Sequence, residues 1–462
     1  MSQSKRLSNL SLARLSLFQG CLGCLAVIFA GMLNRIMISE LAFPAILVGG
    51  SLAFEQLMAP SRVLFGNISD TWPIKGKKRT PYILLGTIGF CSMAIASIPL
   101  IFITERALSE GNWLVITAAA TSLCILFSLY GLAVSLATTP YLALVIDMTN
   151  EEERPRAVGI IWCMLTVGIV IGAIAISITT KGLDGVSDPL LLQPALQKFM
   201  TTISGIVLII TCIACWGIEP TERETINPKN VNSNKNLGLK ASWSIITSSP
   251  QIITFFTFLI LYTLGLFLQD PILESYGAEV FNLPISQTTL LNAFWGIGTL
   301  IGLLIGGLFV TPKLGKLSTA RIGCWMIAIS LILLISSGIT KDTNSLFGVL
   351  VIFGLSAGIA TNSALSLMLD LTLPEMAGTL VGVWGLAQAL SRAMGKIFGG
   401  GLLDIGRALS GPDNPFIAFS FVFILEVIVT CLAIYVLNKV SVKRFKEETS
   451  STIESIMLAD LD

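Results

Sequence analysis

Charged and amide side chains interrupt several long apolar stretches of this sequence. The most regular set is Gln388, Arg392 and Lys396, which recur every four residues and therefore share one face of a helix. Glu55 and Gln56 lie within another apolar stretch. Ionisable groups inside such helices usually face a cavity or pair with one another. We expect this stripe to line a binding cavity. The alternative is an ion pair, between Arg392 and Glu55 for example, that only stabilises helix packing.

Other polar residues extend this candidate site. The cavity candidates are Glu55, Gln56, Asn292, Trp295, Trp384, Gln388, Arg392 and Lys396. A second group flanks two apolar stretches on the side expected to be luminal or periplasmic: Asn34, Arg35, Glu40, Gln269, Asp270 and Glu274. Pro271 can end a helix, so Asp270 and Glu274 either line the mouth of the cavity or lie in water.

The composition argues against several classes of function. The sequence contains no histidine, which removes the commonest general base and metal ligand. It also lacks a P-loop, a Rossmann glycine set and metal-spaced clusters. Its nine cysteines lie in apolar stretches, where buried thiols are poor ligands. The net charge of only +1 gives no reason to expect a nucleic-acid partner. From the missing histidine and motifs, we expect no metal, no nucleotide and no enzyme activity.

These polar residues belong to a chain that is 53% hydrophobic and only 12% charged, about half the charged fraction of a soluble domain. Apolar stretches of about 20 residues are long enough to cross a membrane. They predict about twelve spans, near residues 15–34, 44–65, 81–103, 113–146, 157–178, 199–218, 251–270, 286–310, 320–338, 346–370, 378–403 and 415–438. The first span follows a basic flank but has no small-residue cleavage site, so we expect it to be retained.

The basic residues predict the orientation and the division of the chain. About twenty Lys and Arg residues fall in the termini and loops on one side, against about six on the other, which predicts that both termini are cytoplasmic. Residues 219–250 are too polar to span a membrane. We expect them to link an N-terminal six-helix half, 1–218, to a C-terminal half, 251–438, with a cytoplasmic tail at 439–462.

An internal repeat supports two halves. Residues 138–158 (TTPYLALVIDMTNEEERPRAV) align with residues 361–381 (TNSALSLMLDLTLPEMAGTLV) at a constant offset of 223 residues, so that Asp147 meets Asp370. Two parallel six-helix repeats around a midplane cavity are the plan of the major facilitator fold. The predicted fold class is therefore an all-α membrane protein of two six-helix pseudo-repeats.

A loop motif points to the same fold. Gly66-x-x-x-Asp70, followed by a basic run from Lys77 to Arg79, resembles the cytoplasmic loop motif of that superfamily, with extra residues before the basic run. Its glycine allows close helix approach, and its aspartate can bind a helix N-terminus or a basic residue. The alternative for the basic run alone is topology determination. The predicted cytoplasmic gate comprises Gly66, Asp70, Lys77, Lys78, Arg79, Asp147, Arg154 and Asp370.

Four longer segments resemble the PucC-type family, the (bacterio)chlorophyll delivery proteins of the major facilitator superfamily. They are LNRIMISEL (33–41), GNISDTWPIKGKKRTPYILLG (66–86), FLQDPILESYGAEVFNLPISQTTLL (267–291) and GVWGLAQALSRAMGKIFGGGLLD (382–404). The resemblance implies chlorophyll or bacteriochlorophyll as bound cargo. It implies delivery to light-harvesting or photosystem apoproteins, with pigment-synthesis enzymes as further partners. It also implies a thylakoid or an intracytoplasmic membrane, with lipid around the protein.

With this resemblance, the polar residues acquire candidate roles. Without histidine, the magnesium of a pigment needs an oxygen ligand, for which Glu55, Gln56, Glu274, Asn292 and Gln388 are candidates. Arg392 or Lys396 can donate to a carboxylate or keto group. Two other functions stay open. One is a proton-coupled transporter of a small organic anion of folate or pterin type, with Glu55 or Asp147 as the coupling carboxylate. The other is a non-transporting antenna assembly scaffold.

Overall fold

The described part of the chain is almost entirely helical. The computed structural model describes residues 9–74, 76–149, 154–181, 188–219, 250–370, 377–411, 414–441 and 444. Among these residues, ten helices are long and apolar enough to cross a membrane. The shorter apolar helix α2 (Ala45–Leu57), followed by α3 (Ser61–Thr71), and the 34-residue helix α15 (Ala377–Ser410) correspond to the two other predicted spans. The prediction of an all-α integral membrane protein with about twelve helices is confirmed.

The chain forms two compact units. The first comprises residues 1–227, 270–296 and 396–419. It contains α1 (Asn9–Val27), the π-helical turns η1 (Ile28–Leu33) and η2 (Ile36–Glu40), α2, α3, α4 (Thr80–Glu110), α5 (Trp113–Asp147), α6 (Arg154–Thr179), α7 (Pro189–Cys215), α10 (Leu273–Phe281), the start of α11 (Ile285–Ile305), the end of α15 and the start of α16 (Pro415–Leu437).

The second unit comprises residues 228–269, 297–395 and 420–462. Its described elements are α9 (Pro250–Phe267), most of α11, η5 (Gly306–Val310), α12 (Thr311–Leu314), α13 (Lys316–Thr340), α14 (Thr343–Asp370) and the remaining parts of α15 and α16. Most of the proposed linker, residues 220–249, lies outside the described residues, as does most of the tail. The division into six-helix halves therefore stays a prediction.

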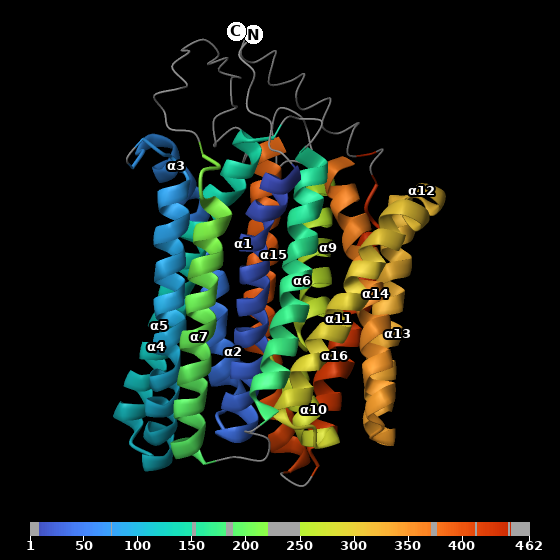
Figure 1. Ribbon diagram of the computed structural model, residues 1–462. Coiled ribbons are helices and arrows are strands. Elements are labelled where there is room, and N and C mark those ends of the chain that lie inside the picture. The colour runs from blue at the N-terminus through green and yellow to red at the C-terminus, as the bar shows by residue number, and fades with distance from the viewer. Residues whose placement is uncertain are drawn as a thin grey trace, which may run out of the picture. The chain divides into compact units, whose positions relative to one another are not determined.

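In the first unit, small residues allow helices to pack backbone against backbone. Helix α4 lies between α5 and α7, and α1 runs along α6 (Figure 1). A Cβ atom on Gly23 would lie well under 3.0 Å from the Leu165 carbonyl oxygen, and one on Gly168 would lie equally close to the Gly20 carbonyl oxygen. The Gly168-x-x-x-Gly172 pattern therefore serves close helix contact.

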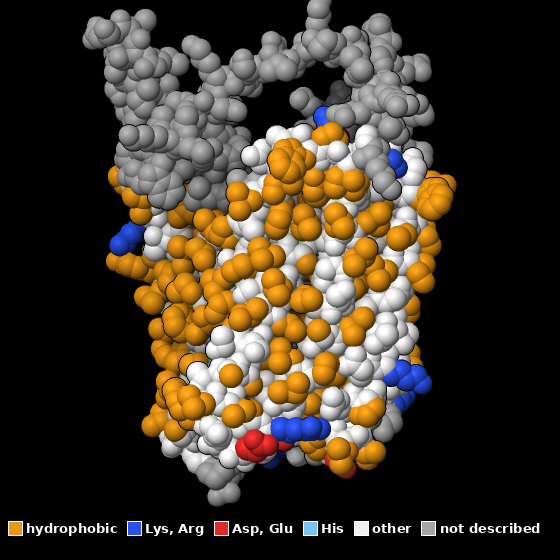
Figure 2. All heavy atoms as spheres, turned by 90° about the vertical axis from the view of Figure 1, so that its left-hand side faces the viewer, with side chains coloured by type: hydrophobic (Ala, Val, Ile, Leu, Met, Phe, Trp, Pro, Cys, Tyr) orange, Lys and Arg blue, Asp and Glu red, His pale blue; other side chains and the backbone are white. Residues whose placement is uncertain are grey.

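The outer face of this unit is apolar. Figure 2 shows hydrophobic side chains covering the face formed by α4, α5 and α7, with charged side chains toward its ends. Leu85, Ile125 and Ile209 are more than half exposed on these helices. A helix that is apolar on all sides requires an apolar surrounding, so this face is in contact with lipid.

In the second unit, too, glycines allow two helices to pack backbone against backbone. Gly298, Gly302 and Gly306 of α11 and η5 face α14. A Cβ atom on Gly298 would lie well under 3.0 Å from the Val351 carbonyl oxygen, and one on Gly302 would lie equally close to the Leu355 carbonyl oxygen. This glycine series therefore packs α11 and η5 against α14.

Several predicted boundaries move for local reasons. Helix α7 starts at Pro189 rather than near 199, because the Asp188 carboxylate accepts a hydrogen bond from the Leu190 N–H (2.9 Å) and proline suits the first helical position. The predicted span 44–65 is divided between α2 and α3. Helix α9 ends at Phe267, before Pro271, but the chain becomes helical again at Leu273.

Candidate functional site

A buried polar cluster surrounds the end of the first helix, within the first unit. Asn34 and Arg35 lie between the π-helical turns η1 and η2. The Asn34 amide donates to the Pro271 carbonyl oxygen. The Arg35 guanidinium donates to the Leu283 carbonyl oxygen (3.2 Å) and pairs with Glu40 (3.0 Å). π-Helical turns often mark functional positions in helices. The structure therefore brings together residues that the sequence placed in separate segments.

Glu274 completes this cluster from α10. Its side chain is only 1% exposed, and its Oε1 accepts a hydrogen bond from the Asn292 amide (2.5 Å). Helix α10 lies outside the long apolar helices. Burial raises the pKa of Glu274 to about 8, while the positive charge of Arg35 and the hydrogen bond from Asn292 oppose that rise. The alternative that Glu274 lies in water is wrong, because α10 resumes after Pro271 and turns this face inward.

The remaining predicted residues of this group divide between the two units. Asp270 is half-buried, at the edge of the first unit. Gln269 is buried in the second unit, where its backbone N–H donates to the Glu426 carboxylate (3.3 Å). Glu426 is fully buried in α16. We did not single it out, although an isolated acid inside an apolar span was a usable signal.

Three further residues at this end of the unit were missed. The Asp404 carboxylate of α15 accepts hydrogen bonds from the backbone N–H groups of Ala45 (3.0 Å) and Ile46 (2.8 Å), at the start of α2. Arg407 pairs with Glu279 of α10 (2.7 Å). Asp404 therefore caps a helix that is remote in sequence. We refer to Asn34, Arg35, Glu40, Glu274, Glu279, Asn292, Asp404 and Arg407 as the polar cluster.

Replacing Asp404 with alanine is expected to lower the free energy of unfolding by about 1–2 kcal/mol, the usual cost of losing an N-cap acceptor. Thermal unfolding of the purified protein in detergent measures this loss. Asp404→Asn keeps one carbonyl oxygen as an acceptor and should lose less. If alanine and the wild type unfold at the same temperature, the cap does not stabilise α2.

Glu55 pairs with a different residue from the one expected. Its carboxylate lies 3.8 Å from the Lys396 Nζ, within the first unit. Here α2 and α15 are in backbone contact, since a Cβ atom on Gly49 would lie well under 3.0 Å from the Lys396 carbonyl oxygen. Arg392, which we expected as the partner, lies one helical turn earlier on the same face. Close packing therefore presents Lys396 to Glu55.

Arg392 and Gln388 belong to the second unit. The Arg392 guanidinium lies 4.4 Å from the ring centroid of Phe267, a distance suited to a cation–π contact. The Arg392 side chain is exposed, whereas Gln388 is half-buried. In the first unit, Gln56 and Trp295 are half-buried. The side chain of Trp384 lies outside the described residues.

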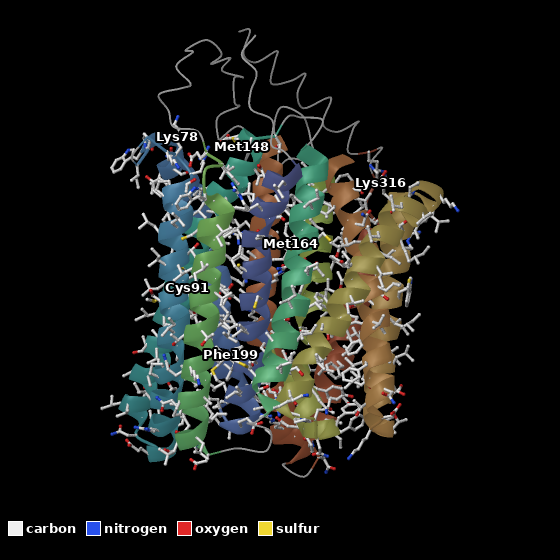
Figure 3. All side chains as sticks on the ribbon, in the orientation of Figure 1. Lys78, Cys91, Met148, Met164, Phe199 and Lys316 are labelled. Atoms are coloured by element: carbon white, nitrogen blue, oxygen red, sulfur yellow. The ribbon has the colours of Figure 1, made fainter. Side chains whose placement is uncertain are left out.

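The predicted gate motif forms a compact set of contacts in the first unit. Arg79 pairs with Asp147 (3.0 Å) and donates to the Ser69 hydroxyl (2.7 Å). A Cβ atom on Gly66 would be in contact with Thr139 of α5 (3.4 Å). Figure 3 shows Lys78 at the same end of this unit as Met148, which directly follows Asp147. The side chains of Asp70, Arg154 and Asp370 lie outside the described residues.

Glu219, which we did not single out from the sequence, contacts the basic run of the predicted gate motif. Its Oε1 accepts hydrogen bonds from the backbone N–H groups of Lys78 (2.6 Å) and Arg79 (2.8 Å), and its Oε2 accepts one from that of Thr80 (2.7 Å). A carboxylate at a helix N-terminus also interacts favourably with the helix dipole. Glu219 therefore joins the end of the 188–219 segment to the start of α4.

The polar side chains in the described part of the chain mainly contact one another and the ends of helices. Among those residues, no group of three His, Cys, Asp or Glu side chains is arranged to hold a metal ion. The polar side chains discussed above form ion pairs and helix caps, and Arg392 forms a cation–π contact with Phe267. These arrangements can hold helix ends together and can present a cation and an amide to a bound molecule.

Comparison with proteins of known structure shows the fold. A bacterial homologue of the human lysosomal transporter Spinster, in an inward-facing and unoccupied conformation, superposes with a TM-score of 0.71 at 14% identity, covering 96% of this chain and 99% of that structure. This similarity confirms the prediction of a major facilitator fold.

Comparison of sequences shows the family. The model of the family described as PUCC protein matches residues 32–445. Protein PucC of Rhodobacter capsulatus is 30% identical over 92% of this chain and 90% of its own length. The bacteriochlorophyll synthase 44.5 kDa chain of Rhodobacter capsulatus is 31% identical over 90% of this chain and 91% of its own length. The chain therefore belongs to the PUCC family.

Proposed function

We propose that this protein binds chlorophyll or bacteriochlorophyll within a photosynthetic membrane and delivers it to light-harvesting or photosystem apoproteins. The observation that carries the proposal is the 31% identity, over nearly the full length of both chains, to a relative named as a chain of bacteriochlorophyll synthase. The residues discussed below bind and hold a pigment, and the proposal assigns no catalytic step to the chain.

The contacts of the candidate residues narrow the choice of pigment ligands. Glu55 is engaged by Lys396, and Glu274 is enclosed with Asn292. Gln388 and Gln56 keep half-buried amide side chains, whose carbonyl oxygens can coordinate magnesium. Arg392 is exposed beside an aromatic ring. A cation, an amide and an aromatic ring suit a large conjugated ligand that carries keto and ester oxygens.

The test is an absorption spectrum of the protein, purified gently from its own membrane, with extraction and quantitation of pigment. We expect a red band at near-stoichiometric pigment content. Gln388→Ala and Arg392→Ala should each weaken retention about tenfold, which corresponds to about 1.4 kcal/mol of lost contact. Leu390→Ala, an exposed apolar position of the same helix, is the matched control and should retain pigment.

The other outcomes point to the two alternative functions. A colourless protein that still captures antenna subunits would indicate the assembly scaffold. A colourless protein without such partners, with gradient-dependent uptake in vesicles, would indicate a transporter of a small organic anion. Either result overturns the proposal of a pigment carrier.

A further inference from the structure

Glu274 is buried, and among the described residues no basic side chain lies within ion-pair distance of its carboxyl group. Its Oε1 accepts from the neutral amide of Asn292, and its Oε2 is buried without a hydrogen-bond partner. The backbone of η1 closes one side, since a Cβ atom on Gly31 would lie well under 3.0 Å from Oε1. An ionised carboxylate is costly in such an enclosure, whereas a neutral carboxylic acid is not.

The charged neighbours do not supply a full counter-charge. The positive charge of Arg35, from the end of the first helix, acts on Glu274, but the Arg35 guanidinium pairs with Glu40 at 3.0 Å. Asp270, which precedes α10, adds a further negative charge. Glu279 on the same helix is paired with Arg407 of α15. From α11, the uncharged side chains of Asn292 and Thr289 act on the carboxyl.

The two carboxylates considered first for proton coupling are in a different situation. Glu55 has Lys396 at 3.8 Å and Asp147 has Arg79 at 3.0 Å. Each of these two carboxylates therefore has a basic partner within ion-pair distance, whereas Glu274 has none among the described residues.

We propose that Glu274 is a proton-binding site whose occupancy controls whether the polar cluster around the end of the first helix is closed. A proton binds the carboxylate to give the neutral acid, which fits the enclosed arrangement. Loss of that proton to water leaves a buried negative charge. The charge is relieved when water enters the cluster or when Arg35 moves from Glu40 to Glu274. This inference is independent of the pigment proposal, because it needs no cargo.

Infrared difference spectroscopy of the full chain in lipid nanodiscs tests proton binding directly. Between about pH 5 and about pH 10, the wild type should show a carboxylic acid carbonyl band that titrates near pH 8, far above the value of about 4.3 for an ordinary glutamate. Glu274→Gln should abolish this band. Glu105→Gln, a half-buried glutamate of α4 outside the polar cluster, should leave it unchanged.

A second variant keeps the test decisive if Glu274→Gln does not fold. Glu40→Gln removes the carboxylate that holds Arg35, so more of the Arg35 charge acts on Glu274 and the titration midpoint should fall. Hydrogen–deuterium exchange, corrected for the intrinsic pH dependence, reports cluster closure. We expect protection of residues 31–45 to fall above about pH 8 in the wild type and to stay constant in Glu274→Gln.

Three results would overturn the inference. One is the absence of any carboxyl band titrating above about pH 6 in the wild type, because a glutamate with an ordinary pKa is ionised there. Another is a band that persists in Glu274→Gln. The third is protection of residues 31–45 that does not change with pH while the band titrates, which would show proton binding without control of the cluster.

Discussion

Replacing Gly302 with leucine is expected to eliminate folded protein. A Cβ atom at this position would lie within 3.0 Å of the carbonyl oxygen, carbonyl carbon and Cα of Leu355, all backbone atoms that cannot rotate away. Helices α11 and α14 would therefore have to separate. Overpacking of a core typically costs about 1–3 kcal/mol even where side chains can move. Detergent extraction followed by size-exclusion chromatography measures the folded, monodisperse fraction.

Gly348→Leu is the matched control for this experiment. Gly348 lies on α14 and is exposed, and a Cβ atom there would meet nothing within 4 Å. The same substitution in the partner helix should therefore leave the folded fraction unchanged. If Gly302→Leu also ran at the wild-type level, the contact between α11 and α14 would be incorrect.

The helical fold could be predicted because one local property decides it. Each span needs about 20 apolar residues, and a backbone in lipid must satisfy its own hydrogen bonds. Apolar length therefore identifies most of the helices without knowledge of their neighbours. The spacing of Gly298, Gly302 and Gly306 also places small residues on one helix face, which indicates a contact face without naming the partner helix.

The partners of the polar residues were less accessible from the sequence. The spacing of Arg392 and Lys396 predicted a shared helix face, but which of them meets Glu55 depends on how far α15 is shifted along α2. That shift is determined by the glycine contacts at Gly49 and Gly400, which join segments remote in sequence. Spacing within one helix therefore gives the face, whereas the partner depends on tertiary packing.

The environment of Glu274 shows a similar limit. Pro271 correctly indicated the end of a helix, but local signals do not say whether the chain then leaves the protein. Its burial depends on Gly31 and Asn292, which lie in two other segments. The only sequence signal for the unusual environment of Glu274 was that no basic residue lies near it in the sequence. It was not sufficient, because Arg35 approaches from the first helix.

Replacing Glu219 with alanine is expected to lower the free energy of unfolding by about 2–4 kcal/mol. Three backbone N–H groups, of Lys78, Arg79 and Thr80, lose their acceptor together. Hydrogen bonds to a charged group contribute about 1.5–3 kcal/mol each, and we reduce the sum because Glu219 is only half-buried. Thermal or denaturant unfolding in detergent measures the change.

The neighbouring ion pair supplies the comparison that isolates this effect. Asp147→Ala removes the partner of Arg79, but half of the Asp147 side chain is exposed, so the expected loss is at most about 1 kcal/mol. Glu219→Gln keeps one carbonyl oxygen as an acceptor. Its loss of unfolding free energy should therefore lie between the losses of Glu219→Ala and Asp147→Ala. If Glu219→Ala cost no more than Asp147→Ala, water would be replacing the carboxylate at the start of α4. The N-terminus of that helix would then depend on Arg79 rather than on Glu219.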